Sequence, residues 1–393
     1  MGIELNKDQI NASLMMENWW YDSNNQVFEV SGAAGTGKTT LVRYLIERLG
    51  LRMDEVLFIA YMGKAATCMQ RNGLPAKTMH SAMYKYERCL VRDPETNKIV
   101  LDDKGLPKME MKFILKKSLG DNIRLVVLDE GSTVSERLAE DLLSFGLPVI
   151  VLGDLNQLPP VMGKPYFLQH PDVILRQIMR QAENSPIVYL SQLILHDRGL
   201  PLGVYGGSAV IQKESLNEYN YRKADIVLTC TNRLRAEVNN LFRTQIKKLR
   251  RLDVPNRGEH IICRKNNWNK SMDGIYLTNG CTGFVDDVEI SSLKDGMINL
   301  DFRPDYASTA YKNLKVDFNR LMGKDPNQTN QYDFHNLCNI FEFGYAITVH
   351  LSQGSQWDDV LFLAEQTSFP ESTRKALMYT AITRAANNIT IAV

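Results

Sequence analysis

The segment GAAGTGKT, Gly32 to Thr39, constrains the fold of this chain more than any other. It follows an apolar run, QVFEVS, and precedes TLVRYLIERLG, which ends at Gly50, a residue typical of helix ends. This order predicts a strand, a glycine-rich loop and a helix, which together form a phosphate-binding loop. Backbone N–H groups of such a loop surround phosphates, and the helix N-terminus favours their negative charge. We therefore expect a nucleoside triphosphate site here.

Each polar residue of the loop has an expected task. Lys38 neutralises the β- and γ-phosphate oxygens, and the Thr39 hydroxyl ligates Mg²⁺. Thr40 fits either the same site or helix packing. The other expected phosphate-binding residues are Gly32, Gly35, Thr36 and Gly37.

Two further apolar runs end in polar residues that suit hydrolysis. LVVLDE ends in Asp129, expected to hold Mg²⁺ directly or through water, and Glu130, expected to polarise the attacking water. An exposed acidic turn is the alternative, but a phosphate loop upstream favours the site. The stretch LGDLNQLPPV, 152–161, sets Gln157 before two prolines. Because proline restricts the backbone, this segment presents a polar side chain rigidly or forms an ordinary turn.

Short apolar runs alternate with helical patterns in two successive sets. Near-continuous apolar strands that alternate with helices are typical of a parallel sheet covered on both faces. We predict an α/β fold of two domains in tandem, 1–183 and 184–393. The runs lie at 56–61, 123–129 and 148–154 in the first domain, and at 224–230, 344–350, 358–364 and the C-terminal NITIAV in the second.

An insertion is predicted in each domain. In the first, at about 84–122, the β-prone segments CLVRD and KIVLDD flank a Pro/Asn turn and predict a β-hairpin. Lys108, Lys112 and Lys116 follow at i, i+4 spacing, which predicts one face of a short helix. In the second domain, short β-prone segments and polar loops between about 284 and 341 predict a small β-rich subdomain.

Composition excludes several classes of protein. With 44% hydrophobic and 23% charged residues, the 393-residue chain is typical of soluble globular proteins. It lacks both an apolar run of roughly 18 residues and a signal-peptide pattern, so we expect a cytoplasmic protein without a membrane partner. The net charge of +1 does not decide on nucleic acid. The segment Arg233 to Lys270, with eleven Lys or Arg against three Asp or Glu, suits either phosphate binding or a solvated helix face.

Several further stretches occur in a fixed order along the chain. They are AYMGKAATCMQ, KTMHSAMY, GDLNQLPPV, LRQIMRQAENSPI, TNRLRAEVN, NGCTGFV, ITVHLSQGSQWDDV and YTAITRA. With these stretches the chain resembles the superfamily 1B helicases, and among these the RecD-like and phage Dda-like enzymes, from LNKDQ to its final strand. The resemblance implies two RecA-like domains, with the hairpin as a candidate strand-separating pin and an SH3-like fold for the second insertion.

The resemblance also implies roles for single residues. Gln9 would bind the adenine edge, Gln157 would sense the γ-phosphate, and Arg180 and Arg384 would reach the γ-phosphate from the second domain. Residues that would contact single-stranded DNA are Lys64, Thr78, His80, Thr348, His350, Ser352 and Gln353. Either histidine fits a packed core equally well.

Four residues depart from the family pattern. Tyr61 and Met62 replace a common Pro-Thr pair, Leu351 stands where lysine is usual, and Gln356 stands where glutamate is usual. These departures weaken the expectation of DNA affinity and of its coupling to hydrolysis. They do not touch the residues expected to hydrolyse ATP.

The implied function is an ATP-driven, Mg²⁺-dependent DNA helicase that moves 5′ to 3′ on single-stranded DNA. Its expected partners are single-stranded DNA and single-strand/duplex junctions, with a single-strand binding protein or a replisome component as a candidate. We expect a monomer encoded by a phage, acting in host cytoplasm in replication, recombination or repair. Alternatives are an RNA helicase of the same superfamily and a nucleotide-switched nucleic-acid binding or loading factor. The set Lys38, Glu130, Gln157, Arg180 and Arg384 favours hydrolysis over a switch.

Overall fold

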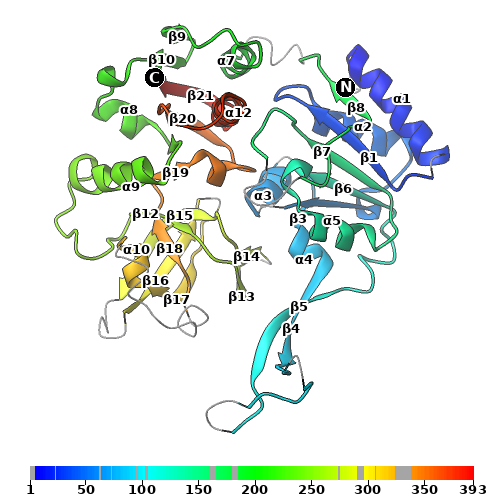
Figure 1. Ribbon diagram of the computed structural model, residues 1–393, viewed down its shortest axis with the longest axis horizontal. Coiled ribbons are helices and arrows are strands. Elements are labelled where there is room, and N and C mark those ends of the chain that lie inside the picture. Colours follow the sequence, from blue (N-terminus) through cyan, green and yellow to red (C-terminus); the bar gives the residue numbers. More distant parts are fainter. Residues whose placement is uncertain are drawn as a thin grey trace.

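A computed structural model gives the architecture of the chain (Figure 1). It describes residues 5–22, 24–61, 63–71, 73–93, 96–101, 105–159, 165–178, 185–272, 275–289, 296–305, 307–323 and 338–393. Two α/β domains lie side by side, with α1 at the outer edge of the first and a β-rich subdomain below the second. None of the helices in the described ranges combines the length and apolar character needed to cross a bilayer.

The first domain is built on a six-stranded parallel sheet of order β3-β2-β6-β7-β1-β8. Its strands are β1 (Val27–Gly32), β2 (Val56–Ala60), β3 (Lys77–Thr78), β6 (Leu125–Asp129), β7 (Val149–Gly153) and β8 (Val173–Leu175). Its helices are α1 (Lys7–Asp22), α2 (Lys38–Arg48), α3 (Gly63–Arg71), α4 (Met79–Met83) and α5 (Glu136–Leu143). The predicted alternation of buried strands and helices is therefore confirmed in this domain.

Successive strand residues of the first sheet enter opposite cores. Phe58 and Val127 pack with residues of α1 and α2 on one face, whereas Ile59 and Leu128 pack with residues of α5 on the other. Because side chains alternate along a strand, a sheet covered on both faces needs apolar residues at every position. This explains the continuous apolar runs in the sequence.

A β-hairpin projects from the first domain (Figure 1). Strands β4 (Tyr84–Leu90) and β5 (Met109–Leu115) pair antiparallel along their whole length. The bridge between Arg92 and Ile99 extends this ladder toward the turn. The helix predicted over the lysine series at 108–116 is wrong, because β5 occupies residues 109–115 of that stretch. Part of the predicted turn, at 94–95, lies outside the described residues.

The second domain has a six-stranded sheet of order β19-β11-β20-β21-β10-β9, parallel except for the β9–β10 pair. Its strands are β9 (Gly203–Tyr205), β10 (Ser208–Ile211), β11 (Ile226–Thr229), β19 (Ala346–Thr348), β20 (Trp357–Leu363) and β21 (Ala385–Ala392). The elements around it are α7 (Pro186–Leu195), α8 (Glu218–Lys223), α9 (Asn232–Leu241), the π-helical turn η4 (Phe242–Ile246), the 3₁₀ turn η7 (Val349–Ser352) and α12 (Glu371–Ile382). Both sheets agree with the predicted tandem of RecA-like folds.

An antiparallel five-stranded sheet of order β17-β16-β15-β12-β18 forms the β-rich subdomain. It comprises β12 (His260–Cys263), β15 (Thr282–Glu289), β16 (Met297–Pro304), β17 (Tyr311–Asp317) and β18 (Phe341–Phe343), with α10 (Phe318–Leu321) after β17. A two-stranded ladder, β13 (Asn267–Met272) with β14 (Ile275–Leu277), adjoins it in sequence. The sheet thus begins at His260, earlier than the predicted start at 284, because β12 pairs with both β15 and β18.

Candidate nucleotide site and strand-contact residues

The loop between β1 and α2 has the backbone that its glycines predict. Gly37 caps α2 with φ 76°, a left-handed conformation that glycine adopts without strain. A Cβ on Gly32 would lie 2.5 Å from Thr36 Oγ1, so this position also requires glycine. Thr36 is fully buried and its hydroxyl donates to the Ala33 carbonyl at 2.9 Å. The glycines and the hydrogen bond of Thr36 therefore hold the loop in this conformation.

The Lys38 ammonium is bound to the loop itself. It donates to the Gly32 carbonyl at 2.5 Å and to the Ala33 carbonyl at 3.4 Å. Thr39, the next residue of α2, is exposed, and Thr40 is half-buried. A phosphate bound in the loop would compete with these two carbonyls for the ammonium.

Gln9, the predicted adenine-binding residue, is fully buried beneath the loop. Its side-chain amide donates to the carbonyls of Thr36 at 3.1 Å and Gly37 at 3.3 Å. Its amide oxygen accepts the backbone N–H of Asn6 at 3.0 Å. These bonds use both amide hydrogens, so in this structure the Gln9 side chain stabilises the loop through its backbone carbonyls.

Asp129 and Glu130 lie together at the carboxyl end of β6. The Glu130 backbone N–H donates to Asp129 Oδ1 at 3.0 Å, and Glu130 has a positive φ of 54°. Such a backbone is unfavourable for a residue with a side chain and is typical of functional sites. Burial raises the pKa of both carboxyls, although Lys38 and Arg384 oppose the shift. The two cations therefore favour the ionised forms that the site would use.

Arg384 approaches Glu130 from the second domain. Its Nη1 lies 3.9 Å from Glu130 Oε1. The guanidinium is held at the end of α12 by the carbonyls of Thr380 at 3.2 Å and Ser355 at 3.1 Å. Only 5% of Arg384 is exposed. The structure thus brings together Lys38, Asp129, Glu130 and Arg384, while Arg180 lies outside the described residues.

The loop after β7 is bound mainly by the second domain. Asp154 is buried, and its Oδ1 accepts the backbone N–H of Asn156 at 3.0 Å. The Leu158 backbone N–H donates to Thr380 Oγ1 at 3.0 Å, and its carbonyl accepts Gln353 Nε2 at 2.6 Å. The half-buried Gln157 lies between these anchors. Sequence predicted stiffness from two prolines, and the structure adds hydrogen bonds across the domain boundary.

Leu158 also packs in the core of the second domain. It is 1% exposed and belongs to the cluster that contains Leu228, Phe362 and Tyr379. A side chain of the first half of the chain is therefore buried within the other half. This apolar contact links the loop to α12.

The predicted DNA contacts of the first domain lie near the base of the hairpin. The Thr78 hydroxyl caps α4 by accepting the Ser81 backbone N–H at 3.2 Å. His80 stacks on Tyr84, with ring centroids 5.6 Å apart, and lies at the same distance from Phe113. Burial lowers the pKa of His80, which favours the neutral ring. These contacts indicate a packing role for His80. Lys64 lies on α3.

The predicted DNA contacts of the second domain lie on β19 and η7. Thr348 is buried, and the fully buried Ser352 hydroxyl donates to the Val349 carbonyl at 2.7 Å. Gln353 is committed to the Leu158 carbonyl. His350 is half-buried, and burial lowers its pKa. Of these four residues, His350 is the most exposed to solvent.

The sequence analysis missed two residues that join the domains. The Tyr379 hydroxyl donates to Asp154 Oδ2 at 2.6 Å, and Thr380 binds the Leu158 backbone. Both precede Arg384 in the stretch YTAITRA. Thr380 lies in the last turn of α12, and Arg384, just after the helix, donates to its carbonyl at 3.2 Å.

Two family models match the chain. The AAA domain model covers residues 4–212, and the UvrD-like helicase C-terminal domain model covers residues 343–391. The first match spans more than half of the chain and contains the phosphate loop, the acidic pair and Gln157. The chain belongs to this AAA domain family, as a superfamily 1B helicase.

Curated relatives of this superfamily 1B helicase are longer proteins. The ATP-dependent RecD2 DNA helicase of Deinococcus radiodurans is 27% identical, with 92% of this chain and 46% of the relative covered. The conjugal transfer protein TraA of Agrobacterium fabrum is 23% identical, with 91% of this chain and 30% of the relative covered. The chain thus spans less than half the length of both proteins.

Solved Pif1 helicases share the fold of this superfamily 1B helicase. A structure of two Pif1 helicases that coordinate at forked duplex DNA covers 98% of this chain and 92% of its own, with 17% identity and a TM-score of 0.53. A Bacteroides Pif1 helicase in complex with ADP-AlF3 and single-stranded DNA has the same coverage and identity, with a TM-score of 0.52. Both likenesses support the tandem fold.

Nucleotide use by a superfamily 1B helicase implies Mg²⁺, and the residues present fit this ion. Thr39 and Asp129 offer hard oxygen ligands beside the loop, which Mg²⁺ prefers. Within the described ranges there is no cluster of three or more His, Cys, Asp or Glu side chains that could hold a metal. An ion bound by one or two protein oxygens together with substrate phosphates needs no such cluster.

Proposed function

We propose that the chain is an ATP-driven, Mg²⁺-dependent DNA helicase that moves 5′ to 3′ on single-stranded DNA. The observation that carries this proposal is the approach of Arg384 to Glu130, at 3.9 Å, across the boundary between the two domains. An arginine supplied from a second domain makes hydrolysis depend on how the domains are arranged. A cycle of ATP binding and hydrolysis can therefore open and close the domains against a bound strand.

The residues of the site have distinct proposed roles. Lys38 and the loop amides hold the triphosphate, Glu130 accepts a proton from the attacking water, and Arg384 stabilises charge on the γ-phosphate. Mg²⁺, bound through Thr39 and Asp129, supplies additional charge neutralisation. Gln157 and Arg180, of which Arg180 lies outside the described residues, keep their proposed roles as sensor and second arginine.

The bonds of the loop after β7 support the coupling step. Gln157 is flanked by Asp154, which binds Tyr379, and by Leu158, which binds Thr380 and Gln353. A displacement of Gln157 on loss of the γ-phosphate would thus act on α12 and η7. Since η7 follows directly from Thr348, the movement reaches the proposed strand-contact residues.

The proposed substrate is DNA. The RecD2 relative is a DNA helicase, and a Pif1 structure with the same fold contains single-stranded DNA. We propose 1–183 and 184–393 as the functional domains, the hairpin as a strand-separating pin and a phage origin with a role in replication, recombination or repair. In that setting the protein acts as a monomer in host cytoplasm, with single-strand/duplex junctions as substrates and a single-strand binding protein or replisome component as a partner.

An unwinding assay on duplexes with a 5′ or a 3′ single-stranded tail tests the proposal. We expect ATP- and Mg²⁺-dependent strand separation from the 5′ tail, with none in Lys38→Ala. Separation only from the 3′ tail would overturn the polarity, and hydrolysis without separation from either tail would reject the helicase assignment. Stimulation of hydrolysis by poly(dT) above that by poly(U) is expected for a DNA enzyme.

A further inference from the structure

Three arginines surround one carboxylate beside α9. Arg235 Nη1, Arg264 Nε and Arg320 Nε lie 2.5, 3.3 and 3.8 Å from the Glu342 carboxylate oxygens. Arg235, Arg320 and Glu342 line a cavity of about 470 Å³ between α9, α10 and β18. Arg243 also lines this cavity but is paired with the buried Glu259 at 2.7 Å. The cluster of Arg235, Arg264 and Arg320, the arginine cluster, therefore has two positive charges in excess.

Several donors of the arginine cluster lack acceptors. Arg235 Nε and Arg264 Nη1 are buried and have no hydrogen-bond partner among the described residues, and Arg264 Nε contacts Glu342 at 3.3 Å as an ion pair without forming a hydrogen bond. A guanidinium group carries five N–H donors and no acceptor, and one carboxylate cannot satisfy three such groups. Burial lowers the pKa of Arg264; Glu342 opposes this, whereas Arg235 and Arg320 add to it. A buried donor without an acceptor is unfavourable, so the cluster is suited to an anion.

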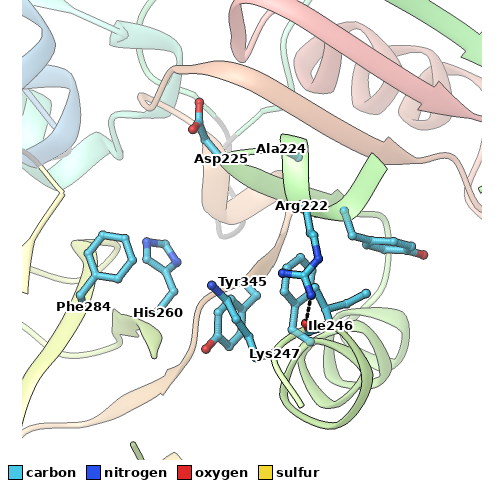
Figure 2. Close-up of a pocket in the computed structure, with 10 residues that line it drawn as sticks. Arg222, Ala224, Asp225, Ile246, Lys247, His260, Phe284 and Tyr345 are labelled. Carbon is cyan, nitrogen blue, oxygen red and sulfur yellow. Dashed lines mark hydrogen bonds between the residues drawn. The ribbon is translucent and has the colours of Figure 1, made fainter. Parts of the chain in front are cut away.

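A second cavity also contains an arginine, but the donors of that arginine have acceptors. It has a volume of about 270 Å³ and is lined by Arg222, Lys247, His260, Phe284 and Tyr345, among others (Figure 2). Its arginine is satisfied, since Arg222 donates to the Ile246 carbonyl and pairs with Glu218 at 2.6 Å. Of these two cavities, as the described residues line them, only the one beside α9 contains a buried guanidinium nitrogen, Arg235 Nε, without a hydrogen-bond partner.

The arginine cluster adjoins the proposed path of the strand. Asn239 on α9 exchanges two 3.0 Å hydrogen bonds with the Ala346 backbone at the start of β19. Since β19 is parallel to β11 and α9 follows β11, the N-terminal end of α9 lies toward the edge where β19 ends at Thr348. Arg235 is one helical turn before Asn239 and is therefore displaced toward that edge.

We propose that the arginine cluster binds a phosphodiester group of a nucleic-acid strand that passes the Thr348 end of β19. Arginine is suited to this ligand because its planar donors match phosphate oxygens in pairs. Arg264 and Arg320 belong to the β-rich subdomain, which thereby forms part of the strand-binding surface. The inference rests on the proposed function and adds a strand contact that the resemblance does not assign, although Arg235 lies in the stretch TNRLRAEVN.

The test uses labelled oligo(dT) in a long and a short form, with affinity measured by fluorescence anisotropy at rising NaCl concentration. In Arg320→Gln we expect several-fold weaker binding of the long form and little change for the short form. The slope of the logarithm of the binding constant against the logarithm of the NaCl concentration should fall in magnitude by about 0.7, the value for one lost phosphate contact on a single strand. Glu342→Gln removes the carboxylate that pairs with the three arginines and should strengthen binding. Arg48→Gln, whose arginine pairs with Glu17 on the outer helices of the first domain, is the control.

The outcomes separate this inference from the proposed function. If the wild-type protein fails to bind either oligonucleotide, both are rejected. If the wild-type protein binds and Arg320→Gln and Glu342→Gln match it in affinity and salt slope, the phosphodiester site alone is rejected. Thermal unfolding with inorganic phosphate distinguishes a free-anion site: protection of the wild type but not of Arg320→Gln, with unchanged oligo(dT) binding, overturns the proposal.

Discussion

The Tyr379 hydroxyl, on α12 of the second domain, donates a 2.6 Å hydrogen bond to the Asp154 carboxylate of the first. The Tyr379 hydroxyl oxygen also accepts the backbone N–H of Ala34, in the phosphate loop, at 3.1 Å. One hydroxyl thus touches the loop that would hold phosphate, the loop that carries Gln157 and the helix that ends near Arg384. Burial, aided by Asp154, raises the pKa of Tyr379, so the hydroxyl keeps its proton.

Tyr379→Phe should weaken communication between the domains. Loss of the hydroxyl removes the Tyr379 partner of Asp154 Oδ2 and of the Ala34 backbone N–H, a cost of about 1–3 kcal/mol in the free energy of unfolding. We expect a lower kcat for DNA-stimulated hydrolysis with little change in KM for ATP. Urea unfolding and steady-state ATPase assays measure the two effects.

Tyr205→Phe is the matched control, because the Tyr205 hydroxyl donates to the Pro201 carbonyl at the surface. It should behave as wild type. Equal DNA stimulation in Tyr379→Phe and wild type would show that the hydroxyl contributes to packing alone.

Leu158→Ala should destabilise the second domain, although Leu158 follows a strand of the first. Truncation of a buried leucine costs about 2–5 kcal/mol, and this side chain fills part of the core around Phe362. Urea unfolding measures the loss of stability, and amide hydrogen exchange shows whether the strands of the second sheet lose protection. Leu155→Ala, at an exposed position of the same loop, should have little effect. A loss of protection confined to the first sheet would contradict the packing described.

The pKa of Glu130 predicts an acid limb in the pH profile of hydrolysis. Burial raises this pKa, so the carboxyl loses its ability to accept a proton at a higher pH than an ordinary glutamate. We expect kcat to fall as the pH is lowered through that raised value. An acid limb at the ordinary carboxyl range would contradict the burial of Glu130 in the active protein.

The same shift predicts the stability of Glu130→Gln. A carboxyl whose pKa is raised by folding contributes stability below its unfolded value, and this contribution is lost as the pH rises through the folded value. At neutral pH the neutral amide should therefore unfold at a temperature no lower than wild type, although hydrolysis is abolished. Calorimetry at several pH values measures the difference, and a clear loss of stability at neutral pH would show that the Arg384 contact outweighs burial.

Gln157→Ala should separate nucleotide binding from its consequences. The side chain is half-buried and the neighbouring anchors use Asp154 and Leu158, so the loop should stay folded. We expect wild-type affinity for a labelled ATP analogue, with hydrolysis and unwinding reduced together. If the protein fails to fold, Gln157 is a structural residue of the turn.

Local patterns predicted the sheets and the phosphate loop because these depend on neighbouring residues. The apolar strands and the conformation of Gly37 follow from alternation and glycine geometry. The lysines at 108, 112 and 116 misled because residues four apart share a face on a strand as well as on a helix. The start of the β-rich sheet at His260 depended on pairing with distant strands, which no local signal marks.

Contacts of single polar side chains were harder to predict. Gln9 and Gln353 both carry amides suited to a base or a strand, yet they bind backbone carbonyls 27 and 195 residues away in sequence. Amide chemistry is the same in both settings, and only the fold decides which acceptor is near. Tyr379 was missed for the same reason, since its partners lie in the other domain.

The burial of Leu158 limits how this protein can be dissected. A fragment that ends at residue 183 would expose the Leu158 side chain to water. A fragment that begins at residue 184 would have a cavity in the core that contains Tyr379, where Leu158 packs in the whole chain. Neither piece would be a faithful stand-alone domain. Complementation between the two fragments, supplied as separate chains, should restore a structure that neither attains by itself.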